Sequence, residues 1–394
     1  MAPEALPPGE HDFSLVLGGP LYQLFGRIGL IRPPLHRLAG RIVAITGFCW
    51  LPLAVLTLLD GRFWSGVRIP FIEDYDAQVR LLAVLPMLIG AEVVVHRKTR
   101  AMVEQFVERQ IVTTDDRGRY DRLLTSTMRL RNSVPIEVVL GLLVFGFGNF
   151  LWRSVVSLNA DTWYASVGEG TRYTPAGYWY AFVSVPVVQF ILLRWYFRLF
   201  LWARFLFKVS RLKLQLIALH PDRSCGLGFL GETVVALGPF LMAHGFFLTG
   251  YMANRILHGT SKLPDFRPEV VAMAVFLLLL SLGPVSVFAA PINRARLGEL
   301  RRYGRLASAY VLDFDRKWLE GKAPEGEALL GTADIQSLAD LANSFEVVRT
   351  VNIFPFGRRT LTQFAVIFAL PILPLTLTMF PLNEIVGRLV KIVL

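Results

Sequence analysis

Long apolar blocks alternate with shorter polar and mostly basic stretches along the 394-residue chain. Seven of these blocks approach the roughly 20 residues that a helix needs to cross the hydrocarbon core of a bilayer. Their apolar residues run continuously instead of recurring on one helical face, as expected where lipid surrounds a helix. The pattern therefore predicts an all-α membrane protein with about seven transmembrane helices, at residues 42–59, 79–95, 134–152, 177–199, 233–252, 270–290 and 361–380.

The predicted spans divide the chain into four parts. Residues 1–41 form a cytosolic or interfacial N-terminal segment, because glycine, proline and arginine interrupt its modest apolar stretch. Residues 42–290 hold six of the helices. Residues 291–360 form a polar region of their own, and residues 361–394 hold the last transmembrane helix and a short amphipathic tail.

Three polar stretches are predicted to be helical on the cytosolic side. Residues 96–132 form a hairpin that extends the second and third spans, and residues 194–219 form a basic juxtamembrane helix. In residues 291–360, apolar or small residues recur at alternating spacings of three and four, which predicts two helices packed as an antiparallel hairpin or against a second copy of the chain. The two seams are Leu297, Leu300, Gly304, Ala307, Val311, Phe314 and Trp318, then Ile335, Leu338, Ala342 and Phe345.

Lysine and arginine are shared unequally between the two sides of the predicted spans. The N-terminal segment and every second segment after it hold 31, and the remaining segments hold 10, which together make the 41 of the chain. Basic residues accumulate on the cytosolic side of inner-membrane proteins. The distribution therefore predicts a bacterial inner-membrane location, a cytosolic N-terminus and a periplasmic C-terminus.

The composition indicates the same class of protein. The chain is 54% hydrophobic and only 18% charged, with a mean hydropathy of +0.48, whereas soluble domains carry roughly 25% charged residues. Nearly all of the net charge of +11 falls on the predicted cytosolic side, where anionic lipid headgroups are the expected partner. Nucleic-acid binding is not needed to explain the charge and is not expected.

Few motifs in the chain carry chemistry. Residues 226–231 match G-x-G-x-x-G, but no strand precedes them and Glu232 follows, so a flexible joint is favoured over dinucleotide binding. His220, Asp222 and Arg223 form a loop at the predicted inner mouth, which could bind a cation or relay a proton, although a turn stiffened by the intervening proline explains them more simply. No nucleophile–base motif and no metal-ligand spacing is present, so no catalytic residue, metal or cofactor is predicted.

Ionisable residues inside the spans are the strongest functional signal, because a charge in lipid is costly unless it is paired or hydrated. They indicate either a water-filled acidic vestibule on an ion pathway or a structural cluster of ion pairs. In both cases we expect a glutamate within ion-pair reach of an arginine. Five charged residues share the inner third of the membrane: Glu92, Glu137, Glu232, Arg194 and Arg198. His244 lies alone at mid-depth, either as a residue of the pathway or as a hydrogen-bonded packing residue.

Three runs of sequence are similar to those of a known family. They are WYFRLF at residues 195–200, HPDR and GLGFL at residues 220–223 and 226–230, and DIQSLADL at residues 334–341. Together they resemble a family of bacterial multi-pass inner-membrane proteins of uncharacterised activity, and the resemblance covers most of the chain. It implies an inner-membrane location and supplies no activity.

Three classes of function compete. An ion or small-solute channel or transporter would use both the intramembrane charges and the prolines that interrupt five of the spans. A non-transporting membrane sensor or scaffold would act through the cytosolic helices, but it leaves those residues without a purpose. A membrane-embedded enzyme has only His220 and Asp222 to offer. The sequence narrowly favours transport, with Glu92, Glu137 and Glu232 attracting cations or relaying protons at the cytosolic mouth.

Overall fold

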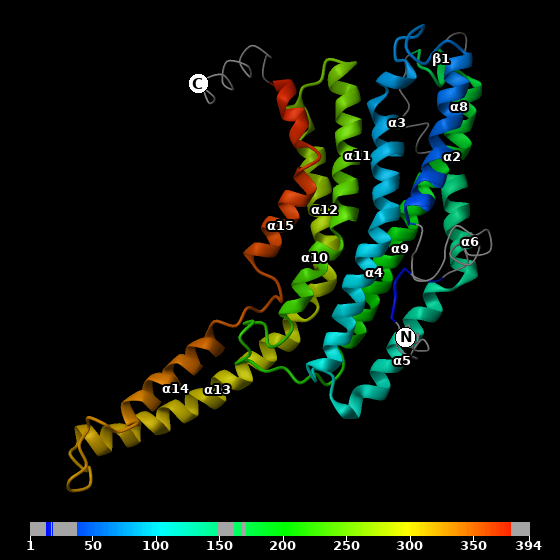
Figure 1. Ribbon diagram of the computed structural model, residues 1–394. Coiled ribbons are helices and arrows are strands. Elements are labelled where there is room, and N and C mark those ends of the chain that lie inside the picture. Colours follow the sequence, from blue (N-terminus) through cyan, green and yellow to red (C-terminus); the bar gives the residue numbers. More distant parts are fainter. Residues whose placement is uncertain (1–12, 17, 19–37, 149–160, 168–170, 380–394) are drawn as a thin grey trace, which may run out of the picture.

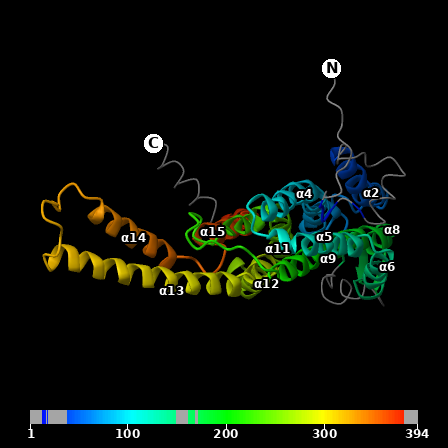
Figure 2. The ribbon, with the colours of Figure 1, turned by 90° about the horizontal axis from the view of Figure 1, so that it is seen from below.

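The computed structural model describes residues 13–16, 18, 38–148, 161–167 and 171–379. Long helices run roughly along one axis and form a bundle, from one end of which a helical hairpin projects (Figures 1 and 2). One short antiparallel pair of strands is the only sheet in the described part. The predicted all-α class is confirmed for these residues.

Most of the helices are long, and several are joined end to end through a local break. In chain order the elements of Figure 1 are α2 (Leu38–Leu59), α3 (Tyr75–Val79), α4 (Leu85–Glu108), α5 (Arg117–Arg131), α6 (Val134–Leu143), β1 (Ala165–Val167), β2 (Thr171–Tyr173), α8 (Pro175–Trp179), α9 (Val185–Val209), α10 (Thr233–Ala236), α11 (Gly238–Leu257), α12 (Arg267–Ser286), α13 (Ala289–Phe314), α14 (Asp334–Arg349) and α15 (Arg358–Ala369).

Two of the breaks are π-helical turns that continue the helix. Arg80–Val84 joins α3 to α4, and Tyr180–Ser184 joins α8 to α9. Each turn comes just before a proline, Pro86 or Pro186, that stands in the first turn of the next helix. Because proline has no backbone N–H to bond to the preceding turn, the extra residue of a π turn there costs little.

Four helices are long and apolar enough to cross a membrane: Leu38–Leu59, Tyr75–Glu108, Pro175–Val209 and Leu263–Ser286. The count reaches six if two bent pairs each form one span, namely Gly228–Ala236 with Gly238–Leu257 and Arg358–Ala369 with Leu373–Met379. The remaining predicted span, residues 134–152, is described only to Gly148, and its apolar helix Val134–Gly146 is shorter. The described residues thus support four to six crossing helices and do not support a count of seven.

The two bent pairs both break beside prolines that interrupt the sequence pattern. The helices α10 and α11 meet at 43°, next to Pro239, and α15 meets the 3-10 helix Leu373–Met379 at 60°, next to Pro371. Proline removes one backbone hydrogen bond and clashes with the preceding turn, so a helix kinks or stops there. The last predicted span is therefore a broken helix.

The hairpin predicted at residues 96–132 is present. The helix α4 continues to Glu108 as one element, and α5 returns beside it, with the Tyr120 hydroxyl donating to the Val103 carbonyl at 2.8 Å. Helix α5 also packs against α9. In Figure 1, α5 lies at the end of the bundle from which α13 and α14 project, opposite the end that carries β1.

The basic juxtamembrane helix predicted at residues 194–219 is shorter than expected. Helix α9 ends at Val209, and the chain beyond it is irregular. There the backbone N–H of Lys213 donates to the Asp116 carboxylate at 2.8 Å, and the N–H of Gln215 donates to the Ile111 carbonyl at 2.8 Å. These contacts with the turn between α4 and α5 replace the helical hydrogen bonds, so the prediction is wrong beyond Val209.

The second predicted hairpin consists of α13 and α14, which lie side by side away from the bundle (Figures 1 and 2). Lys317 pairs with Asp334 at 2.9 Å, and the Tyr310 hydroxyl donates to the Asp334 carbonyl at 3.1 Å. The two helices form a hairpin, but its seam is partly different from the expected one, since Leu297, Val311 and Ile335 are exposed. Exposed apolar residues on the two helices include Leu297, Leu306, Val311, Leu312 and Ile335.

The predicted terminal segments are described only in part. Helix α2 begins at Leu38, four residues before the predicted start of the first span. The interfacial helix expected within residues 1–41 is not formed at residues 13–16, which are non-helical and buried in the core, where Phe13 stacks on Phe205. The rest of that stretch up to residue 37, apart from residue 18, and the tail within residues 380–394 lie outside the described residues.

Candidate functional site

Glu92 is the centre of a buried ion-pair cluster between three helices. It lies on α4, its Oε1 accepts from Arg198 of α9 at 2.8 Å, and its Oε2 accepts from Arg41 at the start of α2. Arg41 also donates to the Ile89 carbonyl at 3.4 Å. The side chains of Arg41, Arg198 and Glu92 are 5%, 7% and 13% exposed. One carboxylate thus holds α2, α4 and α9 together.

A second pair adds a fourth helix to this cluster. Glu137, in the first turn of α6, lies 3.3 Å from Arg194 of α9, and both side chains are 12% exposed. Arg194 stands one helical turn before Arg198 on α9, so the two pairs are neighbours. The expectation that a glutamate lies within ion-pair reach of Arg194 or Arg198 is therefore confirmed twice.

The net charge of the cluster differs from the negative charge expected of an acidic vestibule. With all groups ionised, three arginines face two glutamates, so the described part carries one positive charge in excess. Desolvating charges is expensive, and only close pairing offsets that cost in a low-dielectric interior. The pairing makes Glu92 and Glu137 members of an ion-pair cluster and not a bare acidic lining.

Glu232 belongs to a different place. It ends the 3-10 helix Gly228–Glu232, and its carboxylate lies 2.8 Å from the Lys98 ammonium of α4. The two side chains are 54% and 43% exposed. An exposed pair of this kind contributes little to stability. The structure therefore brings two of the three predicted glutamates together with arginines and leaves Glu232 apart.

His244 is buried in α11 with both ring nitrogens hydrogen-bonded. Nδ1 lies 2.9 Å from the Phe240 carbonyl, and Nε2 lies 2.8 Å from the Tyr196 hydroxyl of α9. Since a carbonyl oxygen can only accept, Nδ1 carries a hydrogen, and in the neutral imidazole Nε2 then accepts from the Tyr196 hydroxyl. This neutral, fully bonded state is typical of a packing residue that joins two helices.

Asp222 organises the loop that was predicted as an inner-mouth site. Its Oδ1 accepts from the backbone N–H groups of Ser224 and Gly226 at 2.9 and 3.1 Å, and Oδ2 accepts from that of Gly228 at 2.8 Å. His220 Nδ1 lies 2.9 Å from the same carboxylate. The glycine run is therefore an ordered turn held by hydrogen bonds to the Asp222 carboxylate, and not the flexible joint expected from its sequence.

The backbone of this turn is unusual and is fixed to a distant segment. Arg223 and Cys225 have positive φ values of 52° and 56°, and Gly226 has a φ of 92°. The Arg223 carbonyl accepts from the N–H of Asn352, which follows α14, at 2.7 Å. The loop thus links the base of the projecting hairpin to the start of α10.

We expect the Asp222 turn to be sensitive to acid. Burial on its own would raise the pKa of Asp222, but the amide hydrogen bonds from Ser224, Gly228 and Gly226 and the nearby His220 outweigh it and hold the pKa below its usual range. The unfolded chain takes up this proton near the ordinary pKa of about 3.9. The stabilisation is therefore complete above that pH and is lost as the pH falls through the lower pKa of the folded turn.

The Asp222→Ala variant tests this expectation. It should lower the free energy of unfolding at neutral pH by about 1–3 kcal/mol, because three amides lose their acceptor. It should also weaken the dependence of thermal unfolding on pH below about 4. Asp340→Ala, on the exposed side of α14, serves as the matched control. Identical pH curves for Asp222→Ala and the unaltered chain would contradict the assignment.

A polar network around Asp74, near the end of the bundle that carries β1, was not predicted from the sequence. Asp74, just before α3, accepts from the Trp163 indole N–H at 2.8 Å, from the Asn254 amide at 2.7 Å and from the Ala77 N–H at 3.1 Å. Trp163 is fully buried. An aspartate just before an apolar helix is a typical N-cap, so the cap could have been predicted, but its two distant partners could not.

Metal ligands and thiols add nothing to these sites. Among the described residues, no three His, Cys, Asp or Glu side chains gather in a way that could hold a metal ion. Cys49 and Cys225 are both buried and are not joined in a disulfide.

Similarity to other proteins gives no further guidance on the site. Neither the protein-family models, nor the curated proteins, nor the solved structures contain a match to this chain. No activity therefore comes to it from a relative.

Proposed function

We propose that the chain is a membrane transport protein for an ion or a small solute, in which the arginine–glutamate cluster around Glu92 and Glu137 is a gate near the cytosolic end. The proposal includes seven crossing helices, a cytosolic N-terminus, a periplasmic C-terminus and a location in the bacterial inner membrane. The last predicted span, broken at Pro371, then counts as one crossing.

One observation carries the proposal: the two broken spans touch each other near one of the breaks. A Cβ atom added to Gly245 of α11 would lie 2.5 Å from the Phe368 carbonyl of α15 and 3.0 Å from Pro371 Cγ. The Thr249 hydroxyl donates to the Pro371 carbonyl at 2.8 Å. Paired discontinuous helices leave backbone groups open to a solute at membrane depth, which is a recurring design of transporters.

The buried charges support the same proposal. Every ion pair of the cluster joins two different helices: α2 with α4, α4 with α9, and α6 with α9. Such pairs can exchange partners when helices move, because the two glutamates and three arginines are neighbours. A paired arrangement excludes water, and a separated one admits it, so the cluster has the parts of a gate.

The test is flux through purified protein in liposomes, measured for a panel of inorganic ions and small polar solutes. We expect flux above that of protein-free liposomes for at least one of them. Glu137→Gln should change that rate severalfold, because Arg194 loses its charged partner. Glu104→Gln is the matched control, since Glu104 pairs with Arg100 on an exposed face of α4. No flux for any solute would contradict transport.

A membrane sensor or scaffold remains the second candidate, and the hairpin of α13 and α14 favours it. The hairpin projects from the bundle, and apolar side chains such as Leu306 and Leu312 are exposed on it. An exposed apolar helix face is typical of a surface that binds another protein or a second copy of the chain. Absence of flux together with a concentration-dependent oligomer would favour this class.

A further inference from the structure

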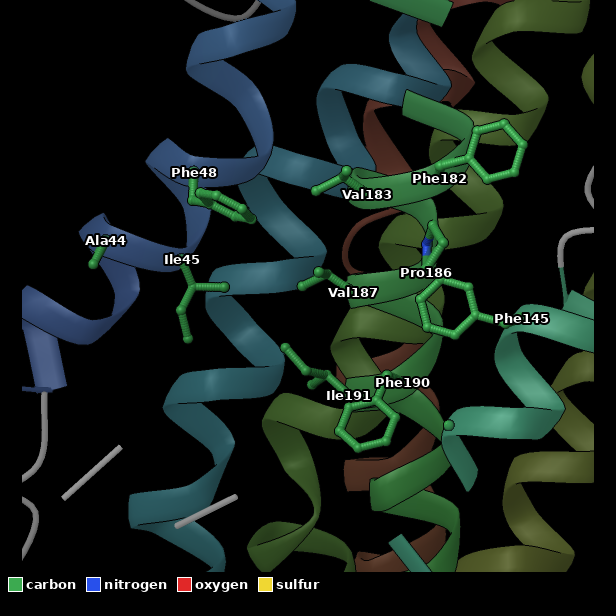
Figure 3. A pocket seen from close by; sticks show the side chains of 11 residues that line it. Ala44, Ile45, Phe48, Phe145, Phe182, Val183, Pro186, Val187, Phe190 and Ile191 are labelled. Carbon is green, nitrogen blue, oxygen red and sulfur yellow. The ribbon is translucent and has the colours of Figure 1, made fainter. Parts of the chain in front are cut away.

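An apolar groove lies between α2, α6 and α9, and Figure 3 shows its walls. Its volume is about 650 Å³, and all 11 residues that line it are apolar. That volume is within the roughly 300–1,000 Å³ typical of binding sites for small organic ligands. The groove is therefore large enough for a ligand and offers it no hydrogen bond along its length.

The groove is open to the surroundings of the bundle. Two of its aromatic side chains, Phe48 of α2 and Phe145 of the π-helical turn after α6, are 55% and 62% exposed. Phe48 belongs to a helix long and apolar enough to cross a membrane, and Phe145 to the shorter apolar helix Val134–Gly146. A hydrocarbon chain can therefore enter from the bilayer sideways, without crossing water.

The charged cluster stands at one end of this groove. Arg41 precedes the lining residue Ala44 by three residues, Glu137 precedes Gly141 by four, and Arg194 follows Phe190 by four. Residues three or four apart share a helix face. All three helices that form the groove thus place a charged residue one turn beyond it, on the side that faces the groove.

The cluster is suited to an anion. It has three arginines for two glutamates, and Arg194 is 12% exposed, while among the described residues its ion pair is with Glu137 at 3.3 Å. A guanidinium has five N–H donors, so one carboxylate leaves donors for another oxygen. Arginine matches the geometry of phosphate oxygens especially well.

We propose that this groove binds one anionic phospholipid, with an acyl chain along the apolar walls and the headgroup phosphate against Arg194. The lipid belongs to the leaflet on the side of the α4–α5 hairpin, because Glu137 at the charged end of the groove lies in the first turn of α6, directly after α5. The inference stands without transport, since it needs only the groove and the cluster.

The experiment is native mass spectrometry of the purified full chain in detergent, with phosphatidylglycerol or phosphatidylcholine of equal chain length added. We expect one phosphatidylglycerol to be retained in preference to phosphatidylcholine. Arg194→Gln should weaken phosphatidylglycerol retention about tenfold, the usual effect of losing a charge-assisted hydrogen bond. Arg211→Gln, an exposed arginine just past the end of α9, should leave it unchanged.

A second variant tests the apolar part of the site separately. Gly141→Leu places a side chain in the groove, where no described atom lies within 4 Å of its Cβ, and should abolish retention of the lipid. Gly283→Leu on α12, whose Cβ position is equally open, is the control and should retain it. If Arg194→Gln does not fold, this pair of variants still decides the question.

Three outcomes would overturn the proposal. Equal retention of both lipids would show that the arginines do not select the headgroup. Protection of the site by inorganic phosphate alone, measured by competition against phosphatidylglycerol, would indicate a free anion instead of a lipid. Retention that persists in Gly141→Leu would place the lipid elsewhere on the bundle. Flux in liposomes is a separate measurement, so failure of either proposal leaves the other to be judged by its own result.

Discussion

Replacing Glu92 with leucine is expected to lower the free energy of unfolding by about 3–5 kcal/mol. The carboxylate is the partner of both Arg41 and Arg198, which are almost fully buried. Its removal leaves two guanidinium groups in a low-dielectric interior without a counter-charge. Thermal unfolding of the detergent-solubilised protein, followed by the loss of its monodisperse gel-filtration peak, measures the effect.

Two further variants separate lost pairing from lost packing at Glu92. Glu104→Leu removes the exposed partner of Arg100 on the same helix, and should cost less than about 1 kcal/mol. The triple replacement of Arg41, Glu92 and Arg198 by leucine should recover most of the loss, because apolar residues often replace a buried ion triad without penalty. Equal loss in Glu92→Leu and Glu104→Leu would show that the cluster is not buried as described.

Gly245→Leu is expected to cost about 3 kcal/mol, at the upper end for overpacking of an interior contact. Its Cβ would lie 2.5 Å from the Phe368 carbonyl, which is backbone and cannot turn aside. Helix α11 must then separate from α15 at the bend of the last span. The same unfolding measurement applies, and flux should fall with it if the two broken spans form the pathway.

The control for Gly245→Leu is Gly283→Leu in α12. No described atom lies within 4 Å of the Cβ position there, so the added side chain meets open space. Its stability should stay close to that of the unaltered chain, since leucine is also the better helix former. A comparable loss in both variants would mean that leucine itself, and not the contact with α15, is responsible.

The apolar blocks of the sequence predicted the helices well because crossing a bilayer depends on local composition. The apolar blocks predicted the ends of the helices less well where a charged residue lies at the end. Arg41 precedes the first predicted span, since an arginine beside an apolar block is read as the edge of the membrane. In the structure it is buried, and its carboxylate partner Glu92 is 51 residues away. Pairing over such a distance leaves no trace in a local pattern.

For the candidate site, the sequence predicted only how deep each residue lies in the membrane. The order of residues along each span gives the depth of Glu92, Glu137 and Glu232, but it does not give their direction around the bundle axis. Two of them meet arginines of α9, and Glu232 meets Lys98 instead. Depth therefore identified ion-pair partners for two residues and failed for the third.

The seam of the second hairpin shows another limit of periodicity. A spacing of three and four selects a face only to within about one residue, which is a turn of roughly 100° in an α-helix. Val311 was expected to lie in the packing seam and is exposed, whereas the neighbouring Tyr310 contacts α14 through its hydroxyl and the Asp334 carbonyl. The π-helical turn Asp315–Leu319 at the end of α13 holds an additional residue per turn, and no spacing rule for α-helices includes it.

The attachment of the α13–α14 hairpin makes it a lever. Its first arm, α13, starts directly after the buried Phe288, with only two residues between it and α12. Its second arm returns to the Asp222 turn through the hydrogen bond between Asn352 and Arg223. At 1.5 Å per residue the 26 residues of α13 are about 39 Å long. A rotation of about 10° at its root would move the far end by about 7 Å. A small movement of the helices in the bundle therefore becomes a large movement at the far end of the α13–α14 hairpin. Another molecule bound to that end would experience the larger movement.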